Sequence, residues 1–215
     1  MPDLAPRPLP VTFIKETGEN AWYFRRYLPY DSEKCPAGHP MGTCDSLFLF
    51  DHRPSDQHPK LEDFLNDPRW PKVCDACHRP FSEMSMQAQL QIFTDAVMVT
   101  QSGERRTFRQ WNKVPGIMWD QTWLHDSPAS CGHDGLSLCV VCPDGAHWGI
   151  DGRALNCTDK EGAAAGRHKC WVRHGTPPGP IHVDKNGPTC SAGAGSIQTD
   201  HWHGFLTNGM LQDNR

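Results

Sequence analysis

Apolar and polar positions alternate along much of the chain at the short period that β-strands require. The aromatic run at residues 21–28 and the apolar run at residues 46–50 each have the length and composition of a strand. Apolar side chains then alternate with polar ones over residues 89–99, and a Ser-Gly pair at residues 102–103 turns the chain into residues 106–108. This pattern predicts a hairpin.

The C-terminal part continues in the same way. Residues 136–141 are mostly apolar, a Pro-Asp-Gly turn follows at residues 143–145, and a second apolar run begins at residue 147. Short strands separated by Asp-Gly and Asn-Gly pairs are typical of an antiparallel meander. We therefore predict a β-rich α+β fold with many loops.

The composition indicates that an apolar core alone does not hold this fold. Only 37% of the 215 residues are hydrophobic, and the 19 Gly and 19 Pro favour turns over long regular elements. The chain also contains 10 Cys and 12 His, which are available either as disulfides or as metal ligands. A loop-rich chain of this kind needs such cross-links.

The compartment decides between disulfides and metal. Residues 1–8 contain no apolar run, and no stretch of about eighteen apolar residues occurs in the sequence. We therefore expect neither secretion by a signal peptide nor a membrane partner. In a reducing compartment the thiols stay free, which favours zinc binding.

The charge gives little support to a nucleic-acid partner. The formal net charge is −4, whereas general nucleic-acid binding needs a basic face. The local basic clusters, Arg105-Arg106 with Arg109 and Arg167-His168-Lys169 with Arg173, are interpreted as solvated surface.

A first group of metal ligands is expected in the N-terminal half. Cys35 and His39 lie in one Pro- and Gly-containing turn, and Cys74 and Cys77 lie in another about forty residues later. Two such turns form a zinc ribbon when each presents two ligands to one tetrahedral ion. Cys44 is an alternative to His39 as the fourth ligand. Four protein ligands would leave no open position, so the zinc would be structural.

A second group is expected near the C-terminus, where four turn-associated residues could close another tetrahedral site. These are Cys157, Cys170, Cys190 and His203. The sequence thus predicts one or two structural zinc ions, and it identifies no catalytic or cofactor-binding residue.

Four segments follow from these observations. We expect an extended N-terminal arm and first strand in residues 1–30, a zinc-ribbon-like module in 31–82, a hairpin and aromatic loop in 83–130, and a β-rich Cys/His segment in 131–215. The first twelve residues are Pro-rich and are expected to order only against a partner or against the body of the protein.

The C-terminal text His201-Trp-His-Gly-Phe-Leu-Thr-Asn-Gly, with the Cys-containing segments before it, resembles a family of bacteriophage-encoded zinc-binding proteins. The resemblance covers roughly the last seventy residues. It implies a phage source and a small β-rich zinc-binding protein. We expect a location in the virion or the host cytoplasm, with the Pro-rich arm and Trp residues packing on other virion proteins or on copies of the same chain. The resemblance implies no established activity, so we expect a non-enzymatic structural or accessory role.

A second resemblance supplies an alternative function. The order Asp51-His52, Asn66 and Cys74-x-x-Cys77-His78 is similar to that in HNH nucleases, in which the strand-end His activates water and a later His or Asn helps to hold the metal. The sequence departs from that family at Pro80, which would break the helix expected after Cys77. An HNH-like metal-dependent endonuclease remains the alternative.

Overall fold

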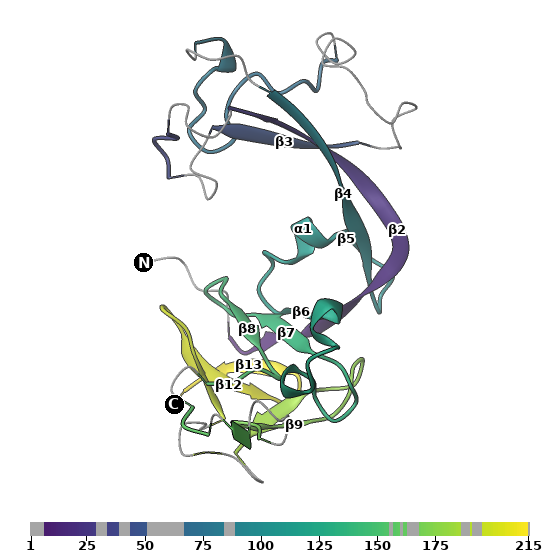
Figure 1. Cartoon of the computed structure of the whole chain (residues 1–215), viewed down its shortest axis with the longest axis vertical. Coiled ribbons are helices and arrows are strands. Elements are labelled where there is room, and N and C mark those ends of the chain that lie inside the picture. Colours follow the sequence, from purple (N-terminus) through teal and green to yellow (C-terminus); the bar gives the residue numbers. More distant parts are fainter. Residues whose placement is uncertain are drawn as a thin grey trace. The chain divides into compact units, whose positions relative to one another are not determined.

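The computed structural model describes residues 7–28, 34–38, 44–50, 67–83, 89–154, 157–159, 161–162, 168–185, 190 and 195–214. Short strands dominate these residues, and the helices among them have three or four residues (Figure 1). The predicted β-rich α+β class is therefore confirmed. No helix of the described part has the length and apolar character that crossing a bilayer requires.

The elements follow in this order along the chain: β1 (Leu9–Pro10), β2 (Thr12–Tyr27), β3 (Asp45–Phe50), η2 (Phe81–Glu83), β4 (Gln89–Thr100), β5 (Arg105–Thr107), α1 (Phe108–Trp111), β6 (Ile117–Asp120), η3 (Thr122–Leu124), η4 (Pro128–Ser130), β7 (Leu138–Val141), β8 (His147–Gly149), β9 (Val172–His174), β10 (His182–Asp184), β11 (Ser196–Gln198), β12 (His203–Thr207) and β13 (Met210–Asp213). The predicted hairpin is present as β4 and β5. The predicted strand at residues 46–50 is β3.

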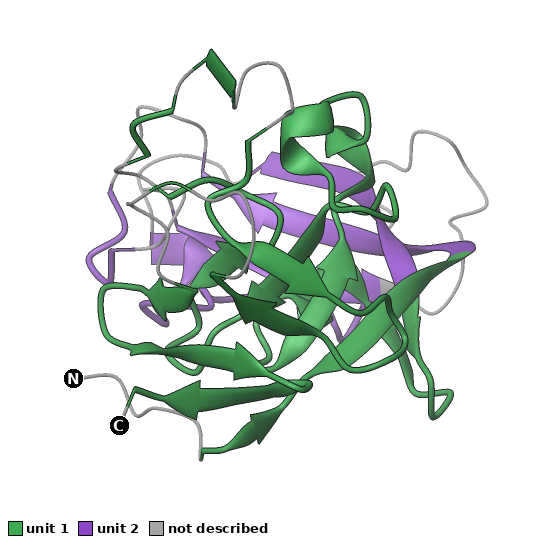
Figure 2. Ribbon diagram, turned by 90° about the horizontal axis from the view of Figure 1, so that it is seen from below, with its two compact units in different colours: residues 1–17, 98–215 green, residues 18–97 purple. Residues whose placement is uncertain are grey.

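The chain divides into two compact units (Figure 2). Unit 1 contains residues 1–17 and 98–215, and unit 2 contains residues 18–97. The long strands β2 and β4 each contribute residues to both units. Of the four segments expected from the sequence, 31–82 falls within unit 2 and 131–215 within unit 1, whereas the other two are divided between the units.

Unit 1 is built around a core of branched and aromatic side chains. Strands β6, β7 and β8 are antiparallel neighbours, β9 pairs with β10, and a further sheet has the order β1-β13-β12-β11. All four residues of β7 are buried, so this strand is covered on both faces. The core includes Met118, Leu138, Val140, Ile150, Trp171, Ile181, Ile197, Trp202, Leu206 and Leu211.

The distinctive C-terminal text encodes the β12–β13 hairpin. Trp202 and Leu206 are buried in the core. Gly204 lies so close to the next strand that a Cβ atom there would be 2.0 Å from the Gln212 carbonyl oxygen. Asn208 and Gly209 both have positive φ, of 48° and 76°, as the two-residue turn of such a hairpin requires.

The Pro-rich N-terminal segment is ordered against the body of unit 1 from residue 7 onward. Leu9 pairs with Leu211 and Pro10 pairs with Met210, and the Val11 N–H donates to the Gly209 carbonyl at 2.8 Å. The side chains of residues 9, 11 and 13 pack against the core. The segment from residue 7 to residue 13 is therefore part of the fold of unit 1.

The described residues of unit 2 form two small buried clusters. Strands β2 and β3 are antiparallel, and their register places Phe24 opposite Phe48, with the two rings stacked 5.2 Å apart. Phe24 and Trp70 form one small buried cluster. A second buried cluster consists of Leu28, Phe81 and cysteines 35, 44 and 74, with Cys77 packed against it. Thiol groups therefore make up much of this second cluster.

Docking of the N-terminal segment can be tested at Gly116, which has a φ of 86° and lies beneath Pro10. A Cβ at Gly116 would be 2.6 Å from the Pro10 carbonyl oxygen, whereas a Cβ at Gly135, with a φ of 80°, would meet no atom within 4 Å. We expect Gly135→Ala to cost about 1–2 kcal/mol in unfolding free energy through backbone strain alone. Gly116→Ala should cost a further ~1–3 kcal/mol from overpacking. Chemical denaturation of both variants measures the difference, and equal losses would contradict the docking.

Candidate metal centres

Four cysteines of unit 2 bring their sulfur atoms to one point, which we name the four-cysteine site. Each of the four Sγ atoms lies within 4.8 Å of the others. The separation is 3.9 Å between Cys35 and Cys74 and 3.7 Å between Cys44 and Cys77. Zinc bonds of about 2.3 Å to tetrahedral sulfur ligands imply sulfur separations of about 3.8 Å. The site therefore has the dimensions of a tetrahedral metal centre.

A tight turn presents Cys74 and Cys77. The Cys74 N–H donates to the Arg79 carbonyl at 3.0 Å, and the His78 N–H donates to the Cys74 carbonyl at 2.9 Å. Burial raises the pKa of the Cys74 thiol, while hydrogen bonds from the Cys77 and Ala76 backbone N–H groups act in the opposite direction. Donors of this kind stabilise a thiolate once a cation is bound.

Hydrogen bonds fix this turn to the start of β3, directly after Cys44. The Asp75 carboxylate accepts from the Ser46 hydroxyl at 2.6 Å and from the Leu47 N–H at 2.9 Å. The Asp75 N–H in turn donates to the Asp45 carbonyl at 2.8 Å. Contacts between backbone and carboxylate therefore hold ligands on the two sides of the site together.

The thiols of this site cannot all ionise without a compensating charge. Burial, followed by the neighbouring thiols, raises the pKa of Cys44 strongly. The pKa of Cys77 is lowered instead, first by the Arg79 backbone N–H and also by the surrounding thiols. One thiolate is thus favoured at the expense of the others, and a divalent cation is what would stabilise several at once.

A second site lies in unit 1 and consists of Cys157, His168, Cys170 and Cys190, which we name the three-cysteine–histidine site. Its ligand atoms also lie within 4.8 Å of one another. Cys190 Sγ is 3.9 Å from Cys157 Sγ and 3.8 Å from Cys170 Sγ. The Cys170 Sγ and His168 Nε2 atoms are 3.6 Å apart, which agrees with the spacing of about 3.6 Å expected for sulfur and nitrogen on one tetrahedral zinc.

This site is largely shielded from water. Cys170 is fully buried, and His168 is 7% exposed. Burial raises the pKa of Cys170 to about 12, although the Ala154 backbone N–H, 3.3 Å from its sulfur, acts against this. The arrangement matches that of the other site, with buried thiols that a cation would deprotonate.

The structure assembles most, but not all, of the predicted ligands. Cys35, Cys74 and Cys77 meet Cys44, the alternative fourth ligand, while His39 lies outside the described residues. Three predicted cysteines, at positions 157, 170 and 190, also come together.

His203 does not join the second site. It lies in β12, where the alternate residues Gly204 and Leu206 face the core, so its own side chain is exposed. Its Nδ1 is 3.3 Å from Asn214 Nδ2. His168, which the sequence analysis had assigned to a basic surface cluster, takes the fourth position instead. Its spacing of two residues from Cys170 was the signal that sequence reasoning overlooked.

Three further cysteines belong to neither site. Cys139 and Cys142 are buried in the core of unit 1, and burial raises the pKa of Cys139 to about 12. The Cys131 thiol lies 3.5 Å from the Leu124 carbonyl oxygen. Cys139 and Cys142 therefore act as small apolar side chains.

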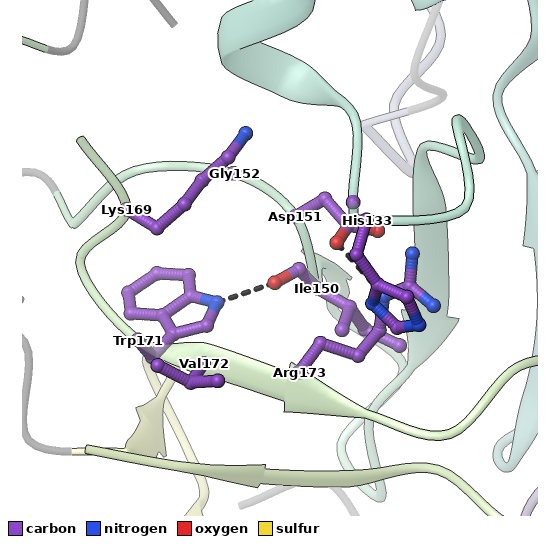
Figure 3. A pocket seen from close by; sticks show the side chains of 9 residues that line it. His133, Ile150, Asp151, Gly152, Lys169, Trp171, Val172 and Arg173 are labelled. Carbon is purple, nitrogen blue, oxygen red and sulfur yellow. Dashed lines mark hydrogen bonds and ion pairs between the residues drawn. The ribbon is translucent and has the colours of Figure 1, made fainter. Parts of the chain in front are cut away.

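Unit 1 contains a cavity of about 220 Å³ (Figure 3). Residues Gly132, His133, Ile150, Asp151, Gly152, Lys169, Trp171, Val172 and Arg173 line it. The Trp171 indole N–H donates to the Ile150 carbonyl. The Lys169 ammonium donates to the carbonyls of Pro128, Ala129 and Cys131 at 3.2, 2.9 and 2.7 Å. These polar groups already have partners within the protein.

Arg173, which was interpreted from the sequence as solvated surface, is instead buried at the centre of an ionic network at this cavity. Its Nε donates to Asp151 at 2.8 Å, and a terminal nitrogen donates to Asp134 at 3.0 Å. The hydrogen bond from Arg173 holds the pKa of Asp134 well below its usual range, whereas burial raises the pKa of Asp151. The network ties the loop at Asp134 to β9, two residues after Trp171.

No protein-family model, curated protein sequence or solved structure matches this chain. The function is therefore inferred from the two groups of Cys and His side chains that come together in the structure.

The positive φ of His78, 58°, gives a test that separates a structural turn residue from a metal ligand. Glycine adopts this conformation without the strain that histidine bears, so His78→Gly should leave stability unchanged or raise it by up to about 1 kcal/mol. Ala76→Gly, in the same turn but without a positive φ, is the matched control and should cost ~0.5–1 kcal/mol. Thermal unfolding and metal content measure both. Loss of metal from His78→Gly would contradict the structural role.

The ionic network gives a second test. Arg173→Met should lower the unfolding free energy by about 3–5 kcal/mol, because it leaves the buried Asp151 without its charged partner. Arg106→Met, which removes an exposed pair with Glu104 in the same unit, should cost about 1 kcal/mol or less. Denaturant titration of both variants compares them, and similar small losses would mean that the network contributes little.

Proposed function

We propose that this chain is a zinc-stabilised structural or accessory component of a bacteriophage particle, which acts through protein–protein contacts. The observation that carries the zinc assignment is the pair of four-ligand groups with tetrahedral dimensions, one in each unit. Four cysteines, or three cysteines with one histidine, are donor sets of structural zinc sites, and thiolates select soft or borderline ions over magnesium and calcium.

The number of ligands supports a structural role for the metal. A catalytic zinc keeps one position open for water or substrate, whereas four protein ligands close the coordination sphere. In unit 2 the cysteines also occupy the interior beside Leu28 and Phe81. Binding of the ion then supplies folding free energy that this small core does not.

An exposed aromatic side chain supports contact with other proteins. Trp123, in η3, is 64% exposed, and large aromatic residues are enriched where proteins associate. Partners would be other virion proteins or copies of this chain. The phage source and the location in the particle are inferred from the resemblance of the C-terminal segments to phage-encoded proteins. The structural or accessory role is inferred from the same resemblance.

Native mass spectrometry tests the zinc assignment directly. We expect two zinc ions per chain in protein purified under reducing conditions. Cys74→Ser should remove the ion of unit 2 and Cys170→Ser that of unit 1, each leaving the other, because the sites share no ligand. Cys139→Ser, at a cysteine outside both sites, is the control and should retain two ions. Reduced wild-type protein without zinc would overturn the assignment.

The particle role needs a separate measurement. Mass spectrometry of purified particles of the encoding phage should detect the chain at a constant copy number, and particles without it would contradict a virion role.

A plasmid-nicking assay with Mg²⁺, Mn²⁺ or Zn²⁺ examines the alternative. Asp51, His52 and Asn66, on which the nuclease resemblance rests, lie outside the described residues. Cleavage by the wild type that is lost in His52→Ala would replace our proposal with the nuclease, because removal of a general base costs about a hundred- to ten-thousand-fold in rate.

A further inference from the structure

The imidazole of His168 contacts different groups through its two nitrogen atoms. Nε2 lies 3.6 Å from Cys170 Sγ, within the three-cysteine–histidine site. Nδ1 lies 3.4 Å from the Asp159 carboxylate. A neutral imidazole carries a single proton, so a metal on Nε2 requires that proton to be on Nδ1. Asp159 is the carboxylate within ion-pair distance of that nitrogen.

Asp159 is itself held in place by the short segment that follows. The Gly162 N–H donates to Asp159 Oδ1 at 2.9 Å, and the His168 N–H donates to the Gly162 carbonyl at 3.0 Å. A Cβ at residue 162 would lie 2.5 Å from one Asp159 carboxylate oxygen, so a larger residue there would displace that carboxylate. Carboxylate, glycine and imidazole therefore form a closed set of contacts that fixes the orientation of the ring.

We infer that Asp159 is a positioning residue for the three-cysteine–histidine site: its carboxylate fixes His168 as the Nδ1-protonated tautomer, with Nε2 directed at the metal. The inference rests on the proposed function, because it presupposes a zinc ion at this site. A carboxylate that accepts from a ligating histidine fixes its tautomer and increases its basicity, and its loss typically costs ten- to a hundred-fold in metal affinity.

Asp159 can be substituted to test its role without disturbing the core of unit 1. Its side chain is 46% exposed, so its replacement leaves the buried core of unit 1 unchanged. Asp159→Asn removes the charge and keeps the size. Gly162→Ala introduces a Cβ that displaces the same carboxylate while every charge stays in place. Asp126→Asn, at an exposed carboxylate outside both sites, is the matched control.

Competition with a chromophoric chelator, on protein that native mass spectrometry shows to hold two zinc ions, measures the two affinities. We expect Asp159→Asn and Gly162→Ala each to weaken one zinc by about ten- to a hundred-fold and to leave the other unchanged. Asp126→Asn should leave both unchanged. Cys170→Ser, which abolishes the site, identifies the affected ion.

Nitrogen-detected NMR of zinc-loaded protein supplies a readout that a purely structural role would not move. In the wild type, His168 should carry its proton on Nδ1 and bind through Nε2. In Asp159→Asn the Nδ1 proton should lose the signature of a hydrogen bond to a carboxylate. Two zinc ions with unchanged affinities in both variants, or coordination through Nδ1, would overturn the inference and leave the proposed function standing. A wild type without zinc at this site would defeat both.

Discussion

Sulfur atoms from cysteines far apart in the sequence lie less than 4 Å from one another in each unit, an arrangement that a cation between them would stabilise. As neutral thiols they would form weak hydrogen bonds, and as thiolates they would repel one another. With a divalent ion each sulfur forms a metal bond instead, and the backbone N–H groups around Cys74 and Cys170 find a charged acceptor.

A bound metal would contribute to the stability of the two units to different degrees. Unit 1 has an extensive apolar core from several strands, and Cys157 and Cys170 of its site belong to that core. In unit 2 the cluster around Leu28 and Phe81 is made mainly of the ligands themselves. Removal of the ion there would leave buried thiols in place of a core, and few apolar contacts would remain to hold the turns.

The elements that were predicted correctly are those determined by interactions between residues close together in the sequence. The alternation over residues 89–99 and the following turn identified the β4–β5 hairpin, and Cys74-x-x-Cys77 identified a ligand turn, because side-chain period and turn chemistry act over a few residues. The full length of β2 was not predicted, since residues 15–20 are polar and mostly exposed, and pairing with strands distant in sequence defines the element. The prediction of His203 in place of His168 as the fourth residue of the second site was wrong for the same reason. Which histidine meets the cysteines depends on tertiary position, and alternation along β12 directs His203 away from the core.

The anchoring of β3 has a consequence for how this protein could change in evolution or be engineered. Cys44 and Cys74 meet at one point, and Asp75, the neighbour of Cys74, forms hydrogen bonds with residues 45–47, which follow Cys44. These bonds hold the two cysteine-bearing segments together. By the general entropy of loop closure, doubling the number of residues between two such fixed points costs only about 0.6 kcal/mol. The number of residues between Leu47 and Cys74 could therefore change widely at little cost to the four-cysteine site.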